Sequence, residues 1–574
     1  MSSFSLPEAA KASWGILWRV VVALSIYALS KFLFRAFTIR TRFRHLARTG
    51  IPMLPHSWLL GHLPIVAQLK KDLPPDISFI LFHGWLASNV KKYFPDLTEV
   101  PPVVYLDMWP FLKDPVVVVF DATASADFMS SRTLQKHPIT KDFLRPLTEG
   151  LDILSSHGEL WKKWRSAFNP GFSPRNIISL IPELLYEMQV FSENMEKRAG
   201  KDGAWSPVFQ LQSDTTKLTL DVIFRASVGN QLGEQSSVSG SPLKLALLDQ
   251  IHEMEAGGDV ARSFFKTGFL PWRRMAVARN NRIMENQLLP DIEKTLTTGN
   301  SEKEKITLLN QALKSVEAAT GQKINSISSL DAISSRSVIC NLKVLLLAGF
   351  ETTSGFICWI FKELQDNPAC MEKLRSEHDE VFGTDADQAT RLLKESPHLL
   401  NSLPYTNAVV KEVLRMYPLT FAIREGTPDY FLRVPGSPIK YPTDKFGIWD
   451  AIGWTQRNPA LWPEPDSFIP ERWLVAQDHR LHPRKDAFRT FGLGQRNCIG
   501  QELATVEAKL VLILCARKFD IEEAWEKWDA QHPHDPKYTV RGQRLYPAGL
   551  GTMHPKDHMP VHVRLRKPKE AAAP

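Results

Sequence analysis

Residues 491–500 read Phe-Gly-Leu-Gly-Gln-Arg-Asn-Cys-Ile-Gly, and an apolar stretch with helical spacing follows at 503–519. A thiolate at Cys498 would face the free amides and the positive dipole end of that predicted helix, and both favour an anion. Gly494 and Gly500 permit backbone angles and close approaches that a side chain would forbid. The stretch therefore predicts a thiolate metal ligand. Taken alone, the cysteine is more typical of a buried structural residue in a glycine-rich turn.

The other cysteines do not point to a disulfide framework or a structural zinc site. The five are odd in number, widely spaced and never in a CxxC pair: Cys340, Cys358, Cys370, Cys498 and Cys515. Such usage fits a reducing compartment, in which a cysteine can stay free as a thiolate.

A charged pair lies upstream, in the stretch NAVVKEVLRMYP. Glu412 and Arg415 are three residues apart, which places a carboxylate and a guanidinium on one helix face. Further along, residues 468–473 read FIPERW and contain Arg472. An exposed pair of this kind is common and contributes little, so an ordinary solvated ion pair is the alternative.

An apolar helix is predicted around residues 345–353, which read LLLAGFETT. Gly349 costs about 1 kcal/mol relative to alanine in a helix and needs a compensating reason. We interpret it as opening space over a flat ligand. Thr352 follows Ala348 by four residues and can compete for its carbonyl, which distorts a helix locally. The alternative is a kinked core helix.

Residues 161–165 read WKKWR, so Trp161 and Arg165 lie one helical turn apart. An amphipathic surface helix would have the same pattern.

Together these motifs resemble one family. FGLGQRNCIG matches the haem-binding signature of the cytochrome P450 superfamily at every fixed position, an agreement whose chance occurrence is on the order of 10⁻⁵. The upstream motifs follow in the family's order, and the long region after 520 is similar to filamentous-fungal members. The resemblance implies that haem b is the cofactor and that Cys498 is its axial iron ligand.

The resemblance also assigns roles to the other motif residues. Thr352 and Glu351 would be catalytic, assisting oxygen activation and relaying protons. Glu412, Arg415 and Arg472 would form a buried architectural triad. The cofactor-binding positions would be Arg496, Trp161, Arg165 and Arg424 at the propionates, with Phe491, Gly494, Gly500, Ala348 and Gly349.

The implied activity is insertion of one atom of dioxygen into a small apolar substrate, plausible in fungal secondary metabolism. NADPH would supply electrons through a separate flavoprotein reductase. A docking face is expected around the cysteine loop, unless its cations are ordinary surface charge: Lys485, Arg489, Lys509, Arg517 and Lys518. The alternatives are an isomerase or dehydratase acting on a peroxide-type substrate, which the intact Glu351-Thr352 pair disfavours, and a non-catalytic haem-binding membrane protein.

The N-terminus predicts a membrane anchor. Residues 14–34 are long and apolar enough to cross a bilayer as a helix, with Trp14 and Trp18 suited to an interfacial belt. Residues 31–48 carry six of the chain's net +8 charges without an acid. Charge gathered beside an apolar segment favours membrane lipid over nucleic acid as a partner, with the bulk of the chain on the cytoplasmic side. The family resemblance implies that this membrane is the endoplasmic reticulum. A buried or interfacial helix is the alternative.

The chain is expected to be mainly α with a small β part, a single cytochrome P450 fold behind a transmembrane helix. We divide it into a lumenal N-terminus (1–13), a transmembrane anchor (14–34), a basic and proline-rich hinge (35–65) and a haem-thiolate catalytic domain (66–574). The polar stretch 297–337 is expected to be a surface connection. The composition of the whole chain, 44% hydrophobic and 23% charged, is that of an ordinary globular protein.

Overall fold

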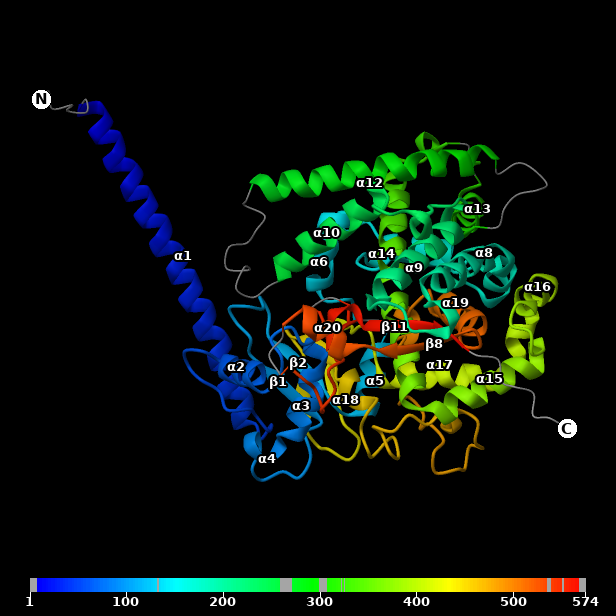
Figure 1. The fold of residues 1–574 in the computed structure, drawn as a ribbon. Helices are drawn as coiled ribbons and strands as arrows, with labels where there is room; N and C mark the ends of the chain where they lie inside the picture. Colours follow the sequence, from blue (N-terminus) through cyan, green and yellow to red (C-terminus); the bar gives the residue numbers. More distant parts are fainter. Residues whose placement is uncertain are drawn as a thin grey trace, which may run out of the picture.

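A computed structural model describes residues 8–131, 134–258, 271–298, 307–321, 323–324, 326–533, 538–549 and 552–566. Helices dominate these residues, which confirms the predicted fold class (Figure 1). The helices are α1 (Glu8–Arg48), α2 (Leu63–Asp72), α3 (Phe82–Ser88), α4 (Val90–Tyr93), α5 (Ala122–Ser130), α6 (Pro138–Thr148), α7 (Gly158–Phe168), α8 (Pro174–Arg198), α9 (Leu211–Val228), α10 (Pro242–Gly258), α12 (Pro271–Thr298), α13 (Leu308–Thr320), α14 (Ala332–Asp366), α15 (Pro368–Phe382), α16 (Gln388–Glu395), α17 (Pro404–Met416), α18 (Ile452–Thr455), α19 (Gln501–Cys515) and α20 (Trp525–Gln531).

The strands form small sheets. The largest has the order β1-β2-β7-β4, in which only the β2–β7 pairing is parallel. A second has the order β3-β11-β8, and among the described residues there are also two strand pairs, β9–β10 and β5–β6. The strands are β1 (Val103–Leu106), β2 (Val116–Val119), β3 (Phe209–Gln210), β4 (Ile423–Glu425), β5 (Phe431–Arg433), β6 (Lys440–Pro442), β7 (Gly447–Asp450), β8 (Phe519–Glu523), β9 (Pro547–Ala548), β10 (His554–Pro555) and β11 (Pro560–Leu565).

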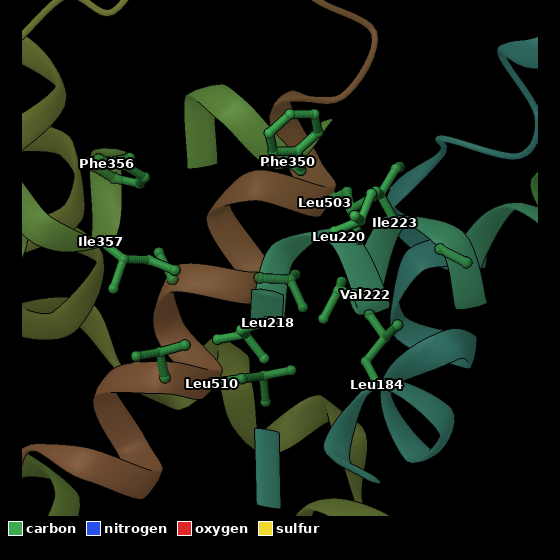
Figure 2. Close-up of a cluster of buried hydrophobic side chains, with 14 of the residues drawn as sticks. Leu184, Leu218, Leu220, Val222, Ile223, Phe350, Phe356, Ile357, Leu503 and Leu510 are labelled. Carbon is green, nitrogen blue, oxygen red and sulfur yellow. The ribbon is translucent and has the colours of Figure 1, made fainter. Parts of the chain in front are cut away.

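The main core lies where α8, α9, α14 and α19 pack together. Figure 2 shows Leu184 of α8, Ile223 of α9, Phe350 of α14 and Leu510 of α19 in one cluster, and all four side chains are buried. The α14 helix is apolar enough to cross a membrane, yet 78% of its most apolar window is buried within the protein. A helix that is apolar all round belongs in a core, so the fold explains the composition of α14.

The N-terminal helix is longer than the predicted anchor. It runs without a break to Arg48, past the expected end at residue 34, and projects from the body of the molecule as a rod (Figure 1). Its apolar residues from Ile16 to Phe34 are exposed, whereas Phe43 and Leu46 are buried against the core around β1 and β2. The first part of the predicted hinge is therefore the docked end of α1.

The basic run on α1 is partly used inside the protein. Arg40 is buried and forms an ion pair with Asp107, which follows β1 and is fully buried as well. Arg35 lies 3.0 Å from an Asp114 carboxylate oxygen. The sequence predicted that this whole basic run faces the membrane. Two of its arginines instead pair with acids of the folded domain, because the end of α1 docks against that domain.

The stretch 297–337 is not simply a surface connection. Within its described part, α13 buries Leu308, Leu309 and Ala312, and it packs against α7. Although the stretch is polar on average, α13 is an amphipathic helix with one side facing the core.

Candidate functional site

The cysteine loop is closed by backbone hydrogen bonding. The Cys498 amide donates to the Phe491 carbonyl across 2.7 Å, and the loop passes through a 3-10 turn, Gly494–Arg496, before α19 begins at Gln501. Gly494 has a φ of +70°, and a Cβ atom there would lie 2.8 Å from the Ser130 Cα atom at the end of α5. The position therefore requires glycine for both its backbone angle and its packing.

The Cys498 thiol differs from those of the other cysteines in its surroundings. Cys498 is exposed, Cys370 is partly buried, and the remaining three are buried. The surrounding protein raises the pKa of the Cys498 thiol by desolvation, while the amides of Gly500 and Gln501 and the charges of Arg165 and Lys136 oppose this rise. The helix end thus favours the anion, as the sequence predicts, and a bound cation would complete its stabilisation.

Two arginines fix the loop and its surroundings. Arg165 on α7 donates to the Asn497 carbonyl across 2.9 Å and to the Asn497 side-chain oxygen across 2.7 Å. Arg496 donates to the Ser156 carbonyl at 3.0 Å, and its guanidinium lies 3.8 Å from the centre of the Trp161 ring. These contacts bring α7 and the cysteine loop together. Such proximity is expected of residues that are predicted to bind the same pair of propionates.

Arg424 on β4 is only 2% exposed, yet two of its guanidinium nitrogens have no hydrogen-bond acceptor among the described residues. Its Nη2 atom donates to the Met129 carbonyl at 3.4 Å, while Nε and Nη1 have no hydrogen-bond partner among the described residues. Burial lowers the pKa of Arg424 to about 10. A buried guanidinium with free donors is costly unless an anion occupies the adjacent space.

Lys136 is a fourth cation at this site, and sequence reasoning missed it. It forms an isolated β-bridge with Arg424, and burial followed by the charges of Arg424 and Arg496 lowers the pKa of Lys136 to about 7. The pairing joins segments far apart in the chain, so it has no local sequence signal. Lys136, Arg165, Arg424 and Arg496 fit a ligand that carries two carboxylates, as haem does.

The predicted catalytic pair lies on a part of α14 that is less buried than the rest. Ala348 is exposed and Gly349, Glu351 and Thr352 are partly buried, whereas residues 337–347 are buried. The Thr352 hydroxyl donates to the Ala348 carbonyl at 2.8 Å, which confirms the hydrogen bond predicted from their spacing.

Gly349 serves packing between helices. A Cβ atom at this position would lie 2.7 Å from the Cγ1 atom of Ile223 on α9. We had interpreted the missing side chain as opening space over a flat ligand. That interpretation was wrong, because a Cβ atom at Gly349 would point towards α9, which fills the space.

Glu351 is a carboxyl group with a strongly shifted pKa. Burial raises the pKa of Glu351 to about 7; the nearby Thr552 hydroxyl offsets part of this rise, and the charge of Glu255 adds to it. The group can therefore hold or release a proton near neutral pH, which is what a proton relay requires.

Glu351→Gln should reduce the loss of stability that occurs as pH rises from about 4.5 to about 7. Because the folded-state pKa lies above the ordinary value, the folded protein keeps a proton that the unfolded chain releases, and the free energy of unfolding falls as pH rises from about 4.5 to about 7. The shift corresponds to about 3 kcal/mol in full, or about 1–2 kcal/mol after discounting for partial solvent access. Urea unfolding at pH 5 and pH 8 checks this, with exposed Glu196→Gln as the control. An equal wild-type-to-variant difference at the two pH values would contradict it.

The Glu412–Arg415–Arg472 triad is assembled as the family pattern implies. Glu412 accepts from Arg415 Nη2 at 2.8 Å and from Arg472 Nε at 2.9 Å, and all three side chains are fully buried. The Trp473 indole nitrogen donates to the other carboxylate oxygen at 3.0 Å. The surface-pair alternative is excluded by this burial.

Part of the expected docking face is not at the surface. Arg489 is 1% exposed and donates to the Ala122 carbonyl, and Arg517 is 7% exposed and pairs with Asp379. Both are structural cations whose partners come from distant segments. Lys485 is exposed, and Lys509 and Lys518 are partly exposed.

Comparisons with known proteins identify the family of the chain. A family model described as cytochrome P450 matches residues 73–542. The cytochrome P450 monooxygenase polC of Polytolypa hystricis is 31% identical and covers 100% of both chains, and acrF of Aspergillus aculeatus is 26% identical over 87% of this chain and 99% of its own. A bifunctional cytochrome P450/NADPH–P450 reductase of Aspergillus oryzae is 26% identical over 73% of this chain and 35% of its own. The crystal structure of the cytochrome P450DA heme domain has a TM-score of 0.69 at 22% identity, covering 91% of this chain and 98% of that one.

Proposed function

The chain belongs to the cytochrome P450 family, and we propose that it inserts one atom of dioxygen into an apolar organic substrate. Its relatives are fungal cytochrome P450 monooxygenases, so the protein is an oxidoreductase. The observation that carries the proposal is the exposed Cys498 thiol at the start of α19, beside four cations of which Arg424 keeps free donors. Such a site fits an anionic porphyrin with a thiolate on its iron.

Cys498 would bind the haem iron through its thiolate, and Arg165, Arg424, Arg496 and Lys136, with Trp161, would hold the propionates. Bound haem supplies the oxygen chemistry, to which a thiolate ligand contributes electron density. Among the other proposed contacts, Ala348 offers exposed surface on α14, and Phe491, Gly494 and Gly500 shape the cysteine loop. Gly349 would act indirectly, by letting α9 approach.

Glu351 and Thr352 are the proposed proton-handling groups. Thr352 is partly exposed, and its hydroxyl is oriented by the Ala348 carbonyl. Because the pKa of Glu351 is raised to about 7, its carboxylate can take up a new proton near neutral pH. Their work would be to pass protons towards reacting oxygen while the surrounding apolar helix limits the entry of other water.

The setting is proposed to be the cytoplasmic face of the endoplasmic reticulum. The exposed apolar part of α1 would be the anchor, with residues 1–13 lumenal, 14–34 in the bilayer and 66–574 forming the catalytic domain. In this division the hinge at 35–65 includes the docked end of α1. NADPH would supply electrons through a separate flavoprotein reductase, a pairing that the fused relative of Aspergillus oryzae carries in one chain.

The substrate is proposed to be a small apolar molecule of fungal secondary metabolism. In the segment after α17, Phe421, Ala422 and Ile423 are partly exposed and mostly apolar, which suits a hydrophobic ligand. The Phe421 ring packs 5.4 Å from that of the buried Trp449, centre to centre, which holds Phe421 in place within this segment.

Carbon-monoxide difference spectroscopy of the reduced full-length enzyme tests the proposal. We expect the red-shifted Soret band typical of thiolate ligation, and oxidation of a metabolite that accumulates in a deletion strain, dependent on NADPH, reductase and dioxygen. Absence of the red shift would reject the haem-thiolate assignment. Turnover that persists without all three co-reactants would instead support the isomerase or dehydratase alternative.

A further inference from the structure

The part of α14 that carries Glu351 and Thr352 accepts hydrogen bonds from hydroxyl groups of the neighbouring helix α9. The Thr219 hydroxyl donates to the Phe350 carbonyl at 2.9 Å, and the Thr215 hydroxyl donates to the Ser354 carbonyl at 3.2 Å. Both threonines are fully buried. The two bonded carbonyls lie on either side of Glu351 and Thr352 in the sequence.

These contacts form a regular series along the helix pair. Thr215, Thr219 and Ile223 are spaced by four residues, so they share one face of α9. They meet Ser354, Phe350 and Gly349 in turn, which means that the two helices run antiparallel. Figure 2 shows Ile223 and Phe350 in the buried cluster between these helices.

A hydroxyl bond to a helix carbonyl is more specific than apolar packing. Apolar side chains permit small slips and rotations between helices, but a hydrogen bond in a buried site requires one alignment. Gly349 fixes how closely α9 approaches, and the threonines fix the axial and rotational position of α14. The same segment already has carbonyls engaged by its own hydroxyls, at Ala348 from Thr352 and at Glu351 from Ser354.

We propose that Thr219 and Thr215 are positioning residues that hold the Glu351–Thr352 segment of α14 in the register needed for proton delivery. The inference rests on the proposed role of that pair and extends it to a helix that carries none of the family motifs recognised in the sequence. Thr219 is the stronger member, since its bond is shorter and its acceptor, Phe350, is adjacent to Glu351. Neither threonine needs to contact the cofactor or the substrate.

The test compares Thr219→Val with Thr219→Ser in the full-length holoenzyme. Valine keeps the shape and removes the donor, whereas serine keeps the donor. In Thr219→Val, the amides of residues 349–354 should exchange with solvent about fivefold faster, because a buried interhelical hydrogen bond is lost. The infrared band of bound carbon monoxide, which senses nearby polar groups, should shift in the direction found for Thr352→Val. Thr219→Ser should restore both readouts.

Thr216→Val is the matched control, because Thr216 is partly exposed on the same helix and, among the described residues, its hydroxyl makes no hydrogen bond to α14. It should leave exchange and the infrared band unchanged. Wild-type values in Thr219→Val, or no recovery in Thr219→Ser, would overturn the inference. If the wild-type enzyme lacks the thiolate signature, the proposed function fails. In that case amide exchange still decides whether the hydroxyl bond fixes the position of α14.

Thr215→Val provides a second variant for the same test if Thr219→Val folds poorly.

Discussion

A Cys498→Ser enzyme should keep its fold and lose monooxygenase activity by on the order of 10³-fold or more. Serine has nearly the same size but does not ionise near neutral pH, so it cannot donate thiolate electron density to iron. The Gly500 and Gln501 amides and the charges of Arg165 and Lys136, which favour an anion at this position, would lose the group they stabilise. Reduced carbon-monoxide spectra and NADPH-dependent oxidation measure the two effects.

Cys370→Ser is the matched control, because Cys370 is partly buried in α15 and lies outside the cysteine loop. It should retain the red-shifted Soret band and the activity of the wild type. Far-ultraviolet circular dichroism should show equal helix content in both variants. A red-shifted Soret band that survives in Cys498→Ser would show that another residue ligates the iron.

The parts of the site predicted from sequence depend on neighbours close in the chain. The Thr352 hydroxyl meets the Ala348 carbonyl because helical geometry brings residues four apart together. The Glu412–Arg415 pair is likewise one helical turn long, and its burial followed from the family pattern rather than from its spacing. Local geometry therefore predicted contacts well, but it did not predict exposure.

The parts that were missed depend on partners far away in the sequence. Lys136 joins the site through a bridge to Arg424, and Arg40 is buried by an acid from beyond β1. Arg489 was expected at the surface because arginine is usually exposed, yet its partners belong to α5 and to the end of β7. Gly349 was recognised as unusual, but the direction of its missing side chain depends on where α9 lies. Tertiary packing decides each of these, and a single sequence does not encode it in any short pattern.

Glu412→Gln should cost about 3–5 kcal/mol of unfolding free energy, because it leaves two buried guanidinium groups without their counter-charge. Glu412 is fully buried and accepts hydrogen bonds from both arginines and from Trp473. Burial lowers the pKa of Arg415, and the Glu412 carboxylate opposes that effect. Glutamine keeps the size of the side chain but has one acceptor oxygen in place of two and carries no charge. The amide NH₂ group of glutamine would then face N–H donors that the carboxylate oxygen accepted from.

Urea unfolding of the holoenzyme measures the loss, and exposed Glu395→Gln, at the end of α16, should change the free energy by less than about 0.5 kcal/mol. We expect haem content to fall in Glu412→Gln in proportion to the unfolded fraction, while the protein that remains folded keeps its Soret position, because the triad supports the fold and does not ligate iron. Glu412→Ala combined with Arg415→Met and Arg472→Met removes every charge of the triad and should recover part of the stability lost in Glu412→Gln, because uncompensated charge is the main cost. A change below about 1 kcal/mol in Glu412→Gln would mean that backbone carbonyls alone satisfy the arginines. Those acceptors are present at Gln456, Pro465 and Ser467 around Arg415, so the comparison measures what the carboxylate adds to them.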